Sequence, residues 1–339
     1  MTEVAVVGLD LAKHVFQVHG ADSAGRPVLK KVLRRHQLLA FFADLPRCLV
    51  GMEACATAHH WARELQALGH EVKLFRPRYV RPFVKTNKND AADAEAIAEA
   101  VTRPTMHFAP VKSAEQQSVL MLHRARELLI RQRTMLVNAV RGHCGEFGPI
   151  AAQGLSRAKA LIAAVEDPAT RLPDVARSAL LILVEQLRTT QAQISAIEDQ
   201  LNDWCRTNEA SRRLVTIPGV GLITATALVA TVGDASQFRS GRHLAAWMGL
   251  VPRQYSSGGK PMLGGISKRG DGYLRRLLVH GARAAIRWQK SGAVPSAWLE
   301  GLLARRPKNV ALVAMANKTA RIAWALLTQG TSFRAAAAV

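Results

Sequence analysis

The chain of 339 residues is poor in acidic residues, cysteines and aromatic side chains. Lys and Arg number 46 against 25 Asp and Glu, which gives a formal net charge of +21 at pH 7. A surface with so few carboxylates favours a polyanionic partner such as nucleic acid. Four scattered cysteines, without C-x-x-C spacing or clustered histidines, argue against a zinc site and a disulfide framework, and they fit a reducing cytoplasm.

The sequence also lacks a long apolar run and an N-terminal targeting pattern. No stretch approaches the roughly 20 apolar residues of a membrane span, and a strand pattern begins at Val4. We therefore expect a cytoplasmic protein without a membrane partner. Because 49% of the residues are hydrophobic, a chain of this length can build two or three cores.

The first hundred residues alternate strand and helix patterns. Strands are predicted at Val4–Asp10, Val15–His19, Val28–Arg34, Cys48–Glu53 and Glu71–Phe75, and helices at Gln37–Leu45 and His59–Leu68. Three short strands in succession predict an antiparallel meander within a mixed sheet that helices cover. Residues 1–110 are accordingly predicted to form an α/β domain.

The next segment, residues 111–207, is predicted to be a helical connector. Ser113 and Gln116 have the spacing of a capping box before a long helix that runs to about His143. A second long helix after Pro173 carries a heptad pattern: Leu180, Leu183, Leu187, Thr190, Ile194, Ile197, Leu201 and Trp204. This pattern fits either a helix packed on its own domain or a coiled coil, formed between chains or as a hairpin within one chain.

Residues 208–330 are predicted to form a separate α-rich domain, followed by a tail at 331–339. Its helices are expected at Leu222–Thr231, Leu274–Arg287 and Val310–Leu327. The segment from Thr216 to Gly221 resembles one half of a helix-hairpin-helix, in which backbone N–H groups hold phosphates, and it makes Gly219 and Gly221 candidates. A plain glycine-rich helix entry is the alternative.

This last domain is strongly basic. Between Arg239 and Arg287 there are ten Lys or Arg and a single acid, Asp271, which favours a phosphate track over an ordinary solvated face. The nucleic-acid-binding candidates here are Arg253, Lys260, Lys268, Arg269, Arg275 and Arg276.

A second basic segment lies between the α/β domain and its last helix. Phe75, Tyr79 and Phe83 recur every four residues, and we expect their rings to pack in the core. The interleaved basic residues are predicted to line nucleic acid: Arg76, Arg78, Arg81, Lys85 and Lys88.

Four carboxylates are the candidate metal ligands. Asp10 ends the first predicted strand and Glu53 the fourth, while Asp90 and Asp93 are three residues apart on a helix and share one face. Hard divalent cations need oxygen ligands, and two metals roughly 4 Å apart stabilise phosphoryl transfer. Singly, each acid also fits a turn or a helix N-terminus. Their joint placement predicts a Mg²⁺ site.

Three segments carry a resemblance to a known family: Gly8-Leu-Asp10 with Lys13, the stretch Met52–Trp61, and the stretch Lys85–Ala94. They resemble the RuvC-like (ribonuclease H fold) domain of DEDD transposases of the insertion-sequence family numbered one-hundred-ten. The context of His59-His60-Trp61 is similar to its eleven-eleven subgroup, which is related to the Piv DNA invertases. The stretches Leu244–Lys260 and Ser267–Gly270 resemble the same family's transposase domain.

The resemblance implies a transposase that recombines donor and target DNA for insertion-sequence transposition. It implies a serine nucleophile before a glycine, which corresponds to Ser257 before Gly258, with Ser256 as the adjacent alternative. A phosphoserine intermediate, a structured noncoding bridge RNA as guide, and a homo-oligomer, dimer or tetramer, are further implications. Two other hypotheses are a RuvC-type junction-resolving nuclease that uses metal-activated water and a non-catalytic nucleic-acid-binding scaffold.

Overall fold

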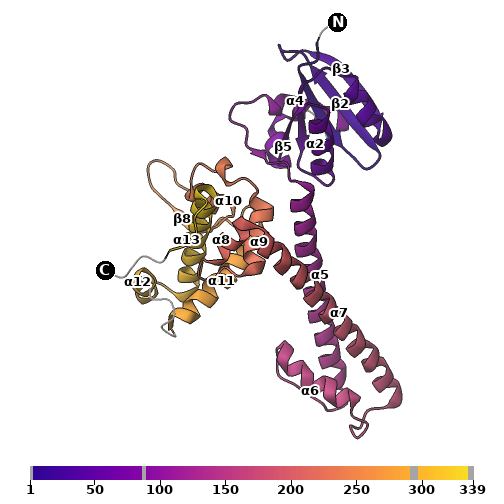
Figure 1. Ribbon diagram of the computed structural model, residues 1–339, viewed down its shortest axis with the longest axis vertical. Helices are drawn as coiled ribbons and strands as arrows, with labels where there is room; N and C mark the ends of the chain where they lie inside the picture. Colours follow the sequence, from indigo (N-terminus) through magenta and orange to yellow (C-terminus); the bar gives the residue numbers. More distant parts are fainter. Residues whose placement is uncertain (1–2, 86–88, 291–296, 335–339) are drawn as a thin grey trace. The chain divides into compact units, whose positions relative to one another are not determined.

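The computed structural model describes residues 3–85, 89–290 and 297–334 of the chain (Figure 1). Contacts within the chain divide it into two compact units, residues 1–117 and 118–339. The boundary lies in the first turns of the long helix α5 (Ala114–Gly145), close to the end predicted for the α/β domain. The further division of the second unit at residue 208 stays a prediction.

The first unit is built on a six-stranded sheet with the order β3-β2-β1-β4-β5-β6. Its strands are β1 (Val6–Leu11), β2 (Val15–Ala21), β3 (Pro27–Arg34), β4 (Leu49–Glu53), β5 (Glu71–Phe75) and β6 (Phe108–Ala109). The pairs β1–β2 and β2–β3 are antiparallel, which confirms the predicted meander, while β4 runs parallel to β1 and β5. This mixed sheet is the arrangement expected of a ribonuclease H-like fold.

Helices cover both faces of the sheet. They are α1 (Leu38–Ala43), α2 (Ala58–Ala67), the short α3 (Pro77–Val80) and α4 (Asp90–Val101), with 3₁₀ turns at Arg35–Gln37 and Arg81–Phe83. Alternate residues of β1 face opposite layers: Val7 and Leu9 are buried with α1 and α2, whereas Val6 packs beside the buried residues of α4. The rings of Phe75 and Phe83 belong to this second cluster, as predicted, but Tyr79 does not: it is half-buried and packs against Arg78 instead.

The second unit begins with a helical hairpin of α5 and α7 (Asp174–Thr207), with α6 (Leu155–Glu166) between them in the chain (Figure 1). The capping box is confirmed, because Ser113 and Gln116 exchange side-chain-to-backbone hydrogen bonds of 2.9 and 3.1 Å. The heptad residues of α7 pack on their own chain: Leu187 lies with Val137 of α5, and Leu201 with Val119. Of the alternatives left open, intramolecular packing is therefore the one observed.

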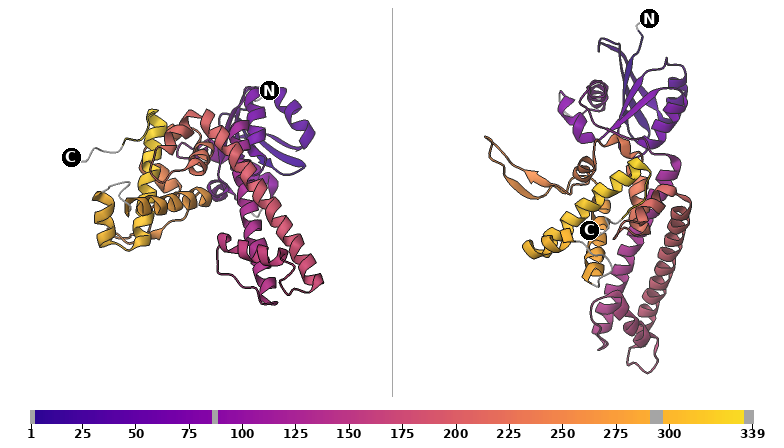
Figure 2. Two further views of the ribbon diagram at one scale, coloured as in Figure 1. Left: turned by 60° about the horizontal axis from the view of Figure 1, so that its bottom comes forward. Right: turned by 60° about the vertical axis from the view of Figure 1, so that its left-hand side comes forward.

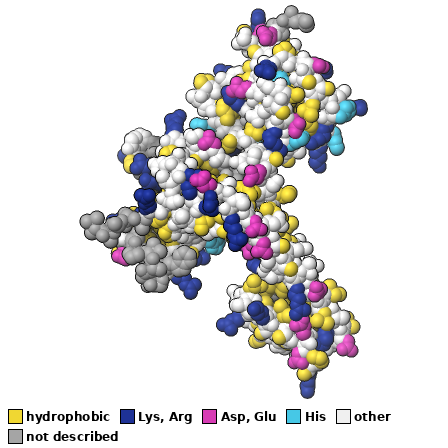
Figure 3. All heavy atoms as spheres, in the orientation of Figure 1, with side chains coloured by type: hydrophobic (Ala, Val, Ile, Leu, Met, Phe, Trp, Pro, Cys, Tyr) yellow, Lys and Arg dark blue, Asp and Glu magenta, His cyan; other side chains and the backbone are white. Residues whose placement is uncertain are grey.

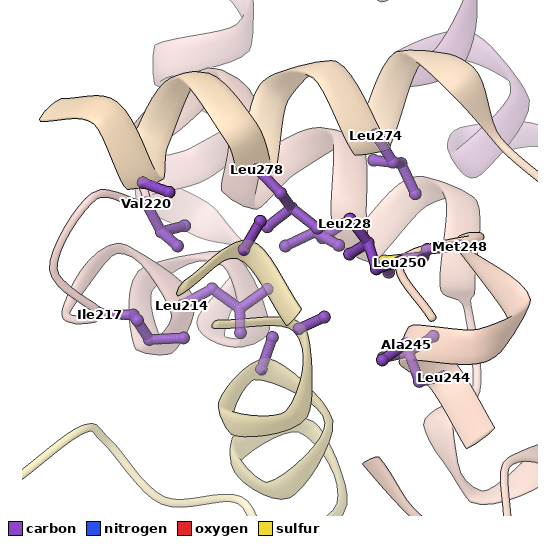
Figure 4. Packing of buried hydrophobic residues seen from close by; sticks show 14 of the residues in the cluster. Leu214, Ile217, Val220, Leu228, Leu244, Ala245, Met248, Leu250, Leu274 and Leu278 are labelled. Carbon is purple, nitrogen blue, oxygen red and sulfur yellow. The ribbon is translucent and has the colours of Figure 1, made fainter. Parts of the chain in front are cut away.

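The rest of this unit is a helical domain with one β-hairpin. Its elements are α8 (Glu209–Val215), α9 (Leu222–Val232), a 3₁₀ turn (Ala235–Gln237), α10 (Gly241–Trp247), β7 (Pro252–Gln254), β8 (Leu263–Ile266), α11 (Gly272–Lys290), α12 (Ala297–Arg305) and α13 (Lys308–Gln329). Figure 4 shows the core that joins them, in which Leu228 of α9 meets Leu274 and Leu278 of α11. The three predicted helices are confirmed as α9, α11 and α13.

The helix α13 corrects one expectation from the sequence. It is 22 residues long and apolar enough, by length and composition, to cross a membrane, although no stretch of that kind was expected. In the structure, however, Leu312, Ala316, Ala320, Ala323 and Leu326 of this helix are buried in the core of the second unit. The apolar composition of α13 is therefore explained by its place in the core.

A buried histidine links α5 to the C-terminal helices. His123 is only 2% exposed, and its two ring nitrogens lie 3.0 Å from the hydroxyls of Tyr273 and Thr226. Because the Thr226 hydroxyl donates to the carbonyl of Leu222, its oxygen accepts from His123 Nε2. His123 Nδ1 then accepts from Tyr273. Burial, aided by the charge of Arg126, lowers the pKa of His123 to about 4.

We predict that this histidine makes the stability of the second unit depend on pH. The unfolded chain binds a proton at His123 near pH 6.5 and the folded chain only near pH 4. The free energy of unfolding therefore falls by about 3 kcal/mol as the pH drops from 6.5 to about 4. Above pH 6.5 this contribution of His123 to stability is fully present. Urea unfolding of the wild type and of His123→Gln, which cannot titrate, measures the difference. Equal pH slopes for the two proteins would contradict the prediction.

Candidate active site

The position of Asp10 follows from the alternation of side chains along β1. Because Val7 and Leu9 face the layer of α1 and α2, Gly8 and Asp10 face α4. The same alternation on β4 directs Gly51 and Glu53 toward α4, since Val50 and Met52 belong to the opposite core. Leu9 pairs with Met52 in the parallel register, so the two acids follow at the same edge of the sheet.

The helix α4 lies unusually close to the sheet at two glycines. A Cβ atom built on Gly8 would lie 2.1 Å from the carbonyl oxygen of Ala94, and one on Gly51 would lie 2.8 Å from Val101 Cβ. Only glycine permits backbones to approach so closely. The beginning of α4 is thereby held beside the end of β1. Asn89 caps this beginning, since its side chain accepts a hydrogen bond of 2.9 Å from the amide of Ala91.

Three of the four predicted acids meet at this point. One carboxylate oxygen of each of Asp10, Asp90 and Asp93 lies within 4.8 Å of the others. Asp90 is exposed and the other two are half-buried, so the group is open to solvent on one side. Such a set of oxygen donors fits a hard divalent cation, which also offsets the mutual repulsion of the acids. Among the described residues, Glu53 lies outside this group of three.

The thiol of Cys55 connects Glu53 to the same region. Burial raises the pKa of Cys55, and the negative charges of Glu53 and Asp10 raise it further. Cys55 therefore lies near enough to both carboxylates to interact with their charges. Glu53 thus lies at the edge where Asp10 emerges, one strand away from it, although its oxygens do not join the cluster.

The basic segment after β5 is partly engaged within the protein. Lys85 forms an ion pair of 3.0 Å with Glu95 of α4 and lies 3.8 Å from Glu99. The guanidinium of Arg78 stacks on the ring of Tyr79, 4.7 Å from its centroid. Arg81 is exposed and Arg76 half-buried. Lys88 lies outside the described residues. Nucleic-acid contact by these five residues stays a prediction.

The predicted serine lies at the tip of the β7–β8 hairpin, which sequence reasoning did not foresee as a hairpin. Gly258 and Gly259 have φ angles of +55° and +74°, and the amide of Lys260 donates to the carbonyl of Ser257 over 3.0 Å. Two positive φ values between paired residues define a type I′ turn, for which Gly-Gly is well suited. Figure 2 shows the hairpin extending away from the helices of its unit.

The two serines of the hairpin differ in their hydrogen bonds. The hydroxyl of Ser256 accepts from the amide of Met262 and from the side chain of Gln254, each over 3.0 Å. Ser256 therefore has a structural role in the hairpin. Ser257 is exposed, and its hydroxyl has no hydrogen-bond partner in the described part of the chain. Of the two, Ser257 is the one available to a substrate.

The glycines of the predicted phosphate-binding turn have different surroundings. Gly219 has a φ of +84°, and a Cβ on it would lie 2.4 Å from the carbonyl oxygen of Gly281 in α11, so this glycine serves helix packing. Gly221 precedes α9 in open space. The segment does join two helices, α8 and α9, but phosphate binding by it stays a prediction.

The remaining basic candidates fall into two groups. Arg275 donates to the carbonyls of Met248 and Arg269, and Arg276 forms an ion pair with Glu127 of α5, so both have partners inside the unit. The others are exposed: Arg253, Lys260, Lys268 and Arg269.

Comparison with known proteins matches both units to models of one family. Residues 7–149 match the model of the DEDD transposase domain, and residues 211–294 match the model described as "Transposase IS116/IS110/IS902 family". The chain belongs to this family of transposases. The four acids of the candidate site fall in the first matched region, and Ser257 falls in the second.

Similar proteins cover almost the whole transposase. A protein of Pseudomonas aeruginosa named "Probable family 20 transposase" is 53% identical over 97% of this chain and 98% of its own length. The transposase for insertion sequence element IS1328 of Yersinia enterocolitica is 44% identical, with coverage of 98% and 99%. That for IS1111A of Coxiella burnetii is 42% identical, with coverage of 99% and 93%.

A shorter match links the transposase to recombination. The pilin gene-inverting protein of Moraxella bovis is 45% identical over 51 residues, which is 15% of this chain. Membership of the DEDD family implies a divalent metal, and the three clustered carboxylates are suited to hold one. The protein is thus an insertion-sequence transposase with a candidate metal site on the α4 face of its sheet.

We predict that Asp10→Asn abolishes stabilisation of the first unit by Mg²⁺. Removing one of three adjacent negative charges weakens metal binding and also relieves repulsion of about 1 kcal/mol per pair in the metal-free protein. Thermal unfolding in EDTA and in Mg²⁺ measures both effects: the midpoint should rise with Mg²⁺ in the wild type but not in Asp10→Asn.

The matched control is Asp203→Asn, which removes an exposed acid of α7 in the second unit. Its midpoint should respond to Mg²⁺ as that of the wild type does. A normal Mg²⁺ response of Asp10→Asn would show that the cluster is not a metal site.

Proposed function

We propose that the protein is a Mg²⁺-dependent DNA recombinase in which Asp10, Glu53, Asp90 and Asp93 serve the metal and Ser257 is the nucleophile. The observation that carries the proposal is the meeting of Asp10, Asp90 and Asp93 within 4.8 Å at the end of β1. Carboxylates this close together are costly without a cation, so their placement supports metal binding. Bound Mg²⁺ would supply positive charge to the phosphate oxygens during phosphoryl transfer.

Each protein group has a distinct task in this proposal. Asp10 projects from the sheet, while Asp90 and Asp93 come from the first turn of a helix that Gly8 holds close to the strand. The ligands are therefore fixed by backbone packing before substrate arrives. Glu53 ends the neighbouring strand at the same edge of the sheet, and in this proposal it completes the ligand set once metal and DNA are bound.

Ser257 supplies the bond exchange. Its oxygen attacks the phosphorus of one DNA strand while the serine proton passes to solvent. The bond between phosphorus and one deoxyribose oxygen breaks, and that oxygen takes up a proton from solvent and leaves as a hydroxyl. A second strand's hydroxyl then reverses these steps, so one phosphodiester replaces another without net hydrolysis. The unengaged hydroxyl of Ser257 and the two flexible glycines after it support this role.

The partners we propose are donor DNA, target DNA and a structured noncoding bridge RNA in the cytoplasm. A net charge of +21 and the exposed cations of the hairpin region support contact with nucleic acid backbones. If base pairing with a guide RNA reads the sequence, the protein needs only to recognise backbone and shape.

We predict that Ser257→Ala abolishes recombination between donor and target plasmids and the covalent protein–DNA adduct. The loss should be complete within detection, because the adjacent hydroxyl, that of Ser256, is engaged by Met262 and Gln254. The assay supplies Mg²⁺ and the noncoding sequence that flanks the element, and denaturing electrophoresis detects the adduct.

Ser256→Ala is the matched control. It should keep the adduct and lower activity only through a weaker hairpin, since each of the two hydrogen bonds lost contributes about 1 kcal/mol. Strand cleavage that survives in Ser257→Ala would favour a nuclease that uses metal-activated water. Activity of the wild type without Mg²⁺ would overturn the metal proposal.

A homo-oligomer is the assembly we propose, with α5 at its interface. Met121, Leu128 and Met135 are spaced by seven residues on α5, and their side chains are 65%, 50% and 69% exposed. Large apolar residues at heptad spacing form one stripe along a helix. Figure 3 shows hydrophobic side chains at the surface of this connector. An exposed apolar stripe of this kind supports pairing with a second chain.

We predict that Leu128→Lys shifts the protein toward the monomer without unfolding it, because a lysine is well solvated at this exposed position but not in an apolar interface. Light scattering coupled to size-exclusion chromatography measures the mass. Ile150→Lys, at a residue that is 84% exposed outside the helices, is the control and should leave the mass unchanged. An unchanged mass of Leu128→Lys would exclude this stripe as the interface.

A further inference from the structure

The second unit contains a large groove that the proposed chemistry does not use. It has a volume of about 1140 Å³ and lies between α10, α12, α13 and the base of the β7–β8 hairpin. All of its lining residues belong to the second unit. Neither the carboxylate cluster nor Ser257 is among them.

The walls of the groove are mostly apolar and include aromatic rings. Trp298 of α12 is 39% exposed and Val310 of α13 is 49% exposed, while Ile266 and Trp324 lie deeper. The Trp324 indole donates to the carbonyls of Ala235 and Phe238, so its nitrogen is satisfied and its ring serves as a wall. A partly exposed tryptophan in an apolar groove offers a surface on which a flat ring can stack.

The charged residues of the groove all have one sign. Arg242, Lys318 and Arg321 line it, and no carboxylate does so among the described residues. Lys318 lies over the Trp298 ring, 4.1 Å from its centroid. Arg242 and Arg321 are exposed, and neither forms an ion pair within the described ranges.

Backbone packing brings together the two helices that carry these arginines. A Cβ atom on Gly241 would lie 2.9 Å from Cα of Arg321, so the start of α10 rests directly on α13. Arg242 follows Gly241 in the chain, so the backbones of Arg242 and Arg321 lie near each other, and both residues line the groove. Cations that line one groove without an acidic partner favour an anionic ligand. An anion with several charged oxygens, such as a phosphate, suits both guanidinium groups.

The combination of features selects the kind of ligand. An apolar peptide would explain the walls but not the unpaired arginines, and a simple anion would explain the arginines but not the walls. A nucleotide has both a flat ring that stacks on tryptophan and a phosphate that pairs with arginine. Its base must be unpaired, because a base within a duplex is already stacked and has no exposed face.

The hairpin relates the groove to the DNA strand. Pro252 and Ile266, at the base of the hairpin, line the groove, and Ser257 follows Pro252 by five residues at the tip. Five residues of antiparallel strand span roughly 17 Å. This length corresponds to about five stacked nucleotides at about 3.4 Å each, and to fewer when the strand is stretched.

We propose that this groove binds unpaired nucleotides of the DNA strand that Ser257 engages, with Trp298 stacking a base and Arg242 and Arg321 holding its phosphate. The choice of DNA rests on the proposed function, because strand exchange exposes single-stranded DNA next to the hairpin. The groove is thus a binding site for unpaired nucleotides of this strand, formed by residues other than the carboxylate cluster and Ser257.

The test is fluorescence anisotropy of a short labelled single-stranded DNA with the full chain in EDTA, so that no cleavage occurs. The double variant Arg242→Ala/Arg321→Ala and the single variant Trp298→Ala should each weaken binding by about tenfold. A duplex of the same sequence should bind each variant as it binds the wild type, within about twofold.

Two controls separate this proposal from general charge effects and from catalysis. Lys159→Ala removes an exposed cation of α6, and it should change the affinity for single-stranded and for duplex DNA equally. Ser257→Ala should bind single-stranded DNA normally, so that failure of the proposed nucleophile and failure of the groove give different results. Circular dichroism of Trp298→Ala and of the arginine variant checks the fold.

Three outcomes would overturn the proposal. The first is unchanged binding of single-stranded DNA by the arginine variant. The second is an equal loss for single strand and duplex, which would show a general cationic surface. The third is a loss confined to single-stranded RNA of the same sequence, which would make the groove an RNA site.

Discussion

The contact on which the candidate active site depends is the close approach of α4 to β1 at Gly8. The carbonyl of Ala94 occupies the space where any other residue would have its Cβ atom. With the helix held there, its first turn stands beside the end of the strand, and Asp90 and Asp93 reach Asp10. A larger residue at position 8 would move the helix outward and separate the carboxylates. The candidate metal site is therefore a consequence of backbone packing.

The second unit follows a different principle, in which a compact helical core supports one projecting element. Leu228, Leu274 and Leu278 hold α9 and α11 together, and the β7–β8 hairpin leaves this core with few contacts at its tip. Gly258 and Gly259 form the turn of the hairpin. Ser257, the nucleophile we propose, is exposed there, while the groove at the hairpin's base is lined mostly by helices.

Several features of the chain could be predicted from the sequence because they depend on local patterns. The strand order of the meander, the capping box of Ser113 and Gln116, and the helices α9, α11 and α13 follow from periodicity and from caps. Three short elements of the second unit were not predicted: α8 and α10 have seven residues each, and the β7–β8 hairpin has little apolar alternation. Their stability comes from tertiary contacts, which leave no periodic signal.

By itself the sequence determined which reactive and charged groups the protein has. They are an excess of cations, acids at the ends of two strands and at the start of a helix, and a serine before two glycines. Only the tertiary structure decided how those groups are used. It brought three acids within 4.8 Å and left Glu53 outside their group, it engaged Ser256 while leaving Ser257 available, and it paired Arg276 with Glu127. The reason is physical: residue type fixes charge and hydrogen-bonding capacity, whereas distance and exposure depend on packing between segments far apart in the chain.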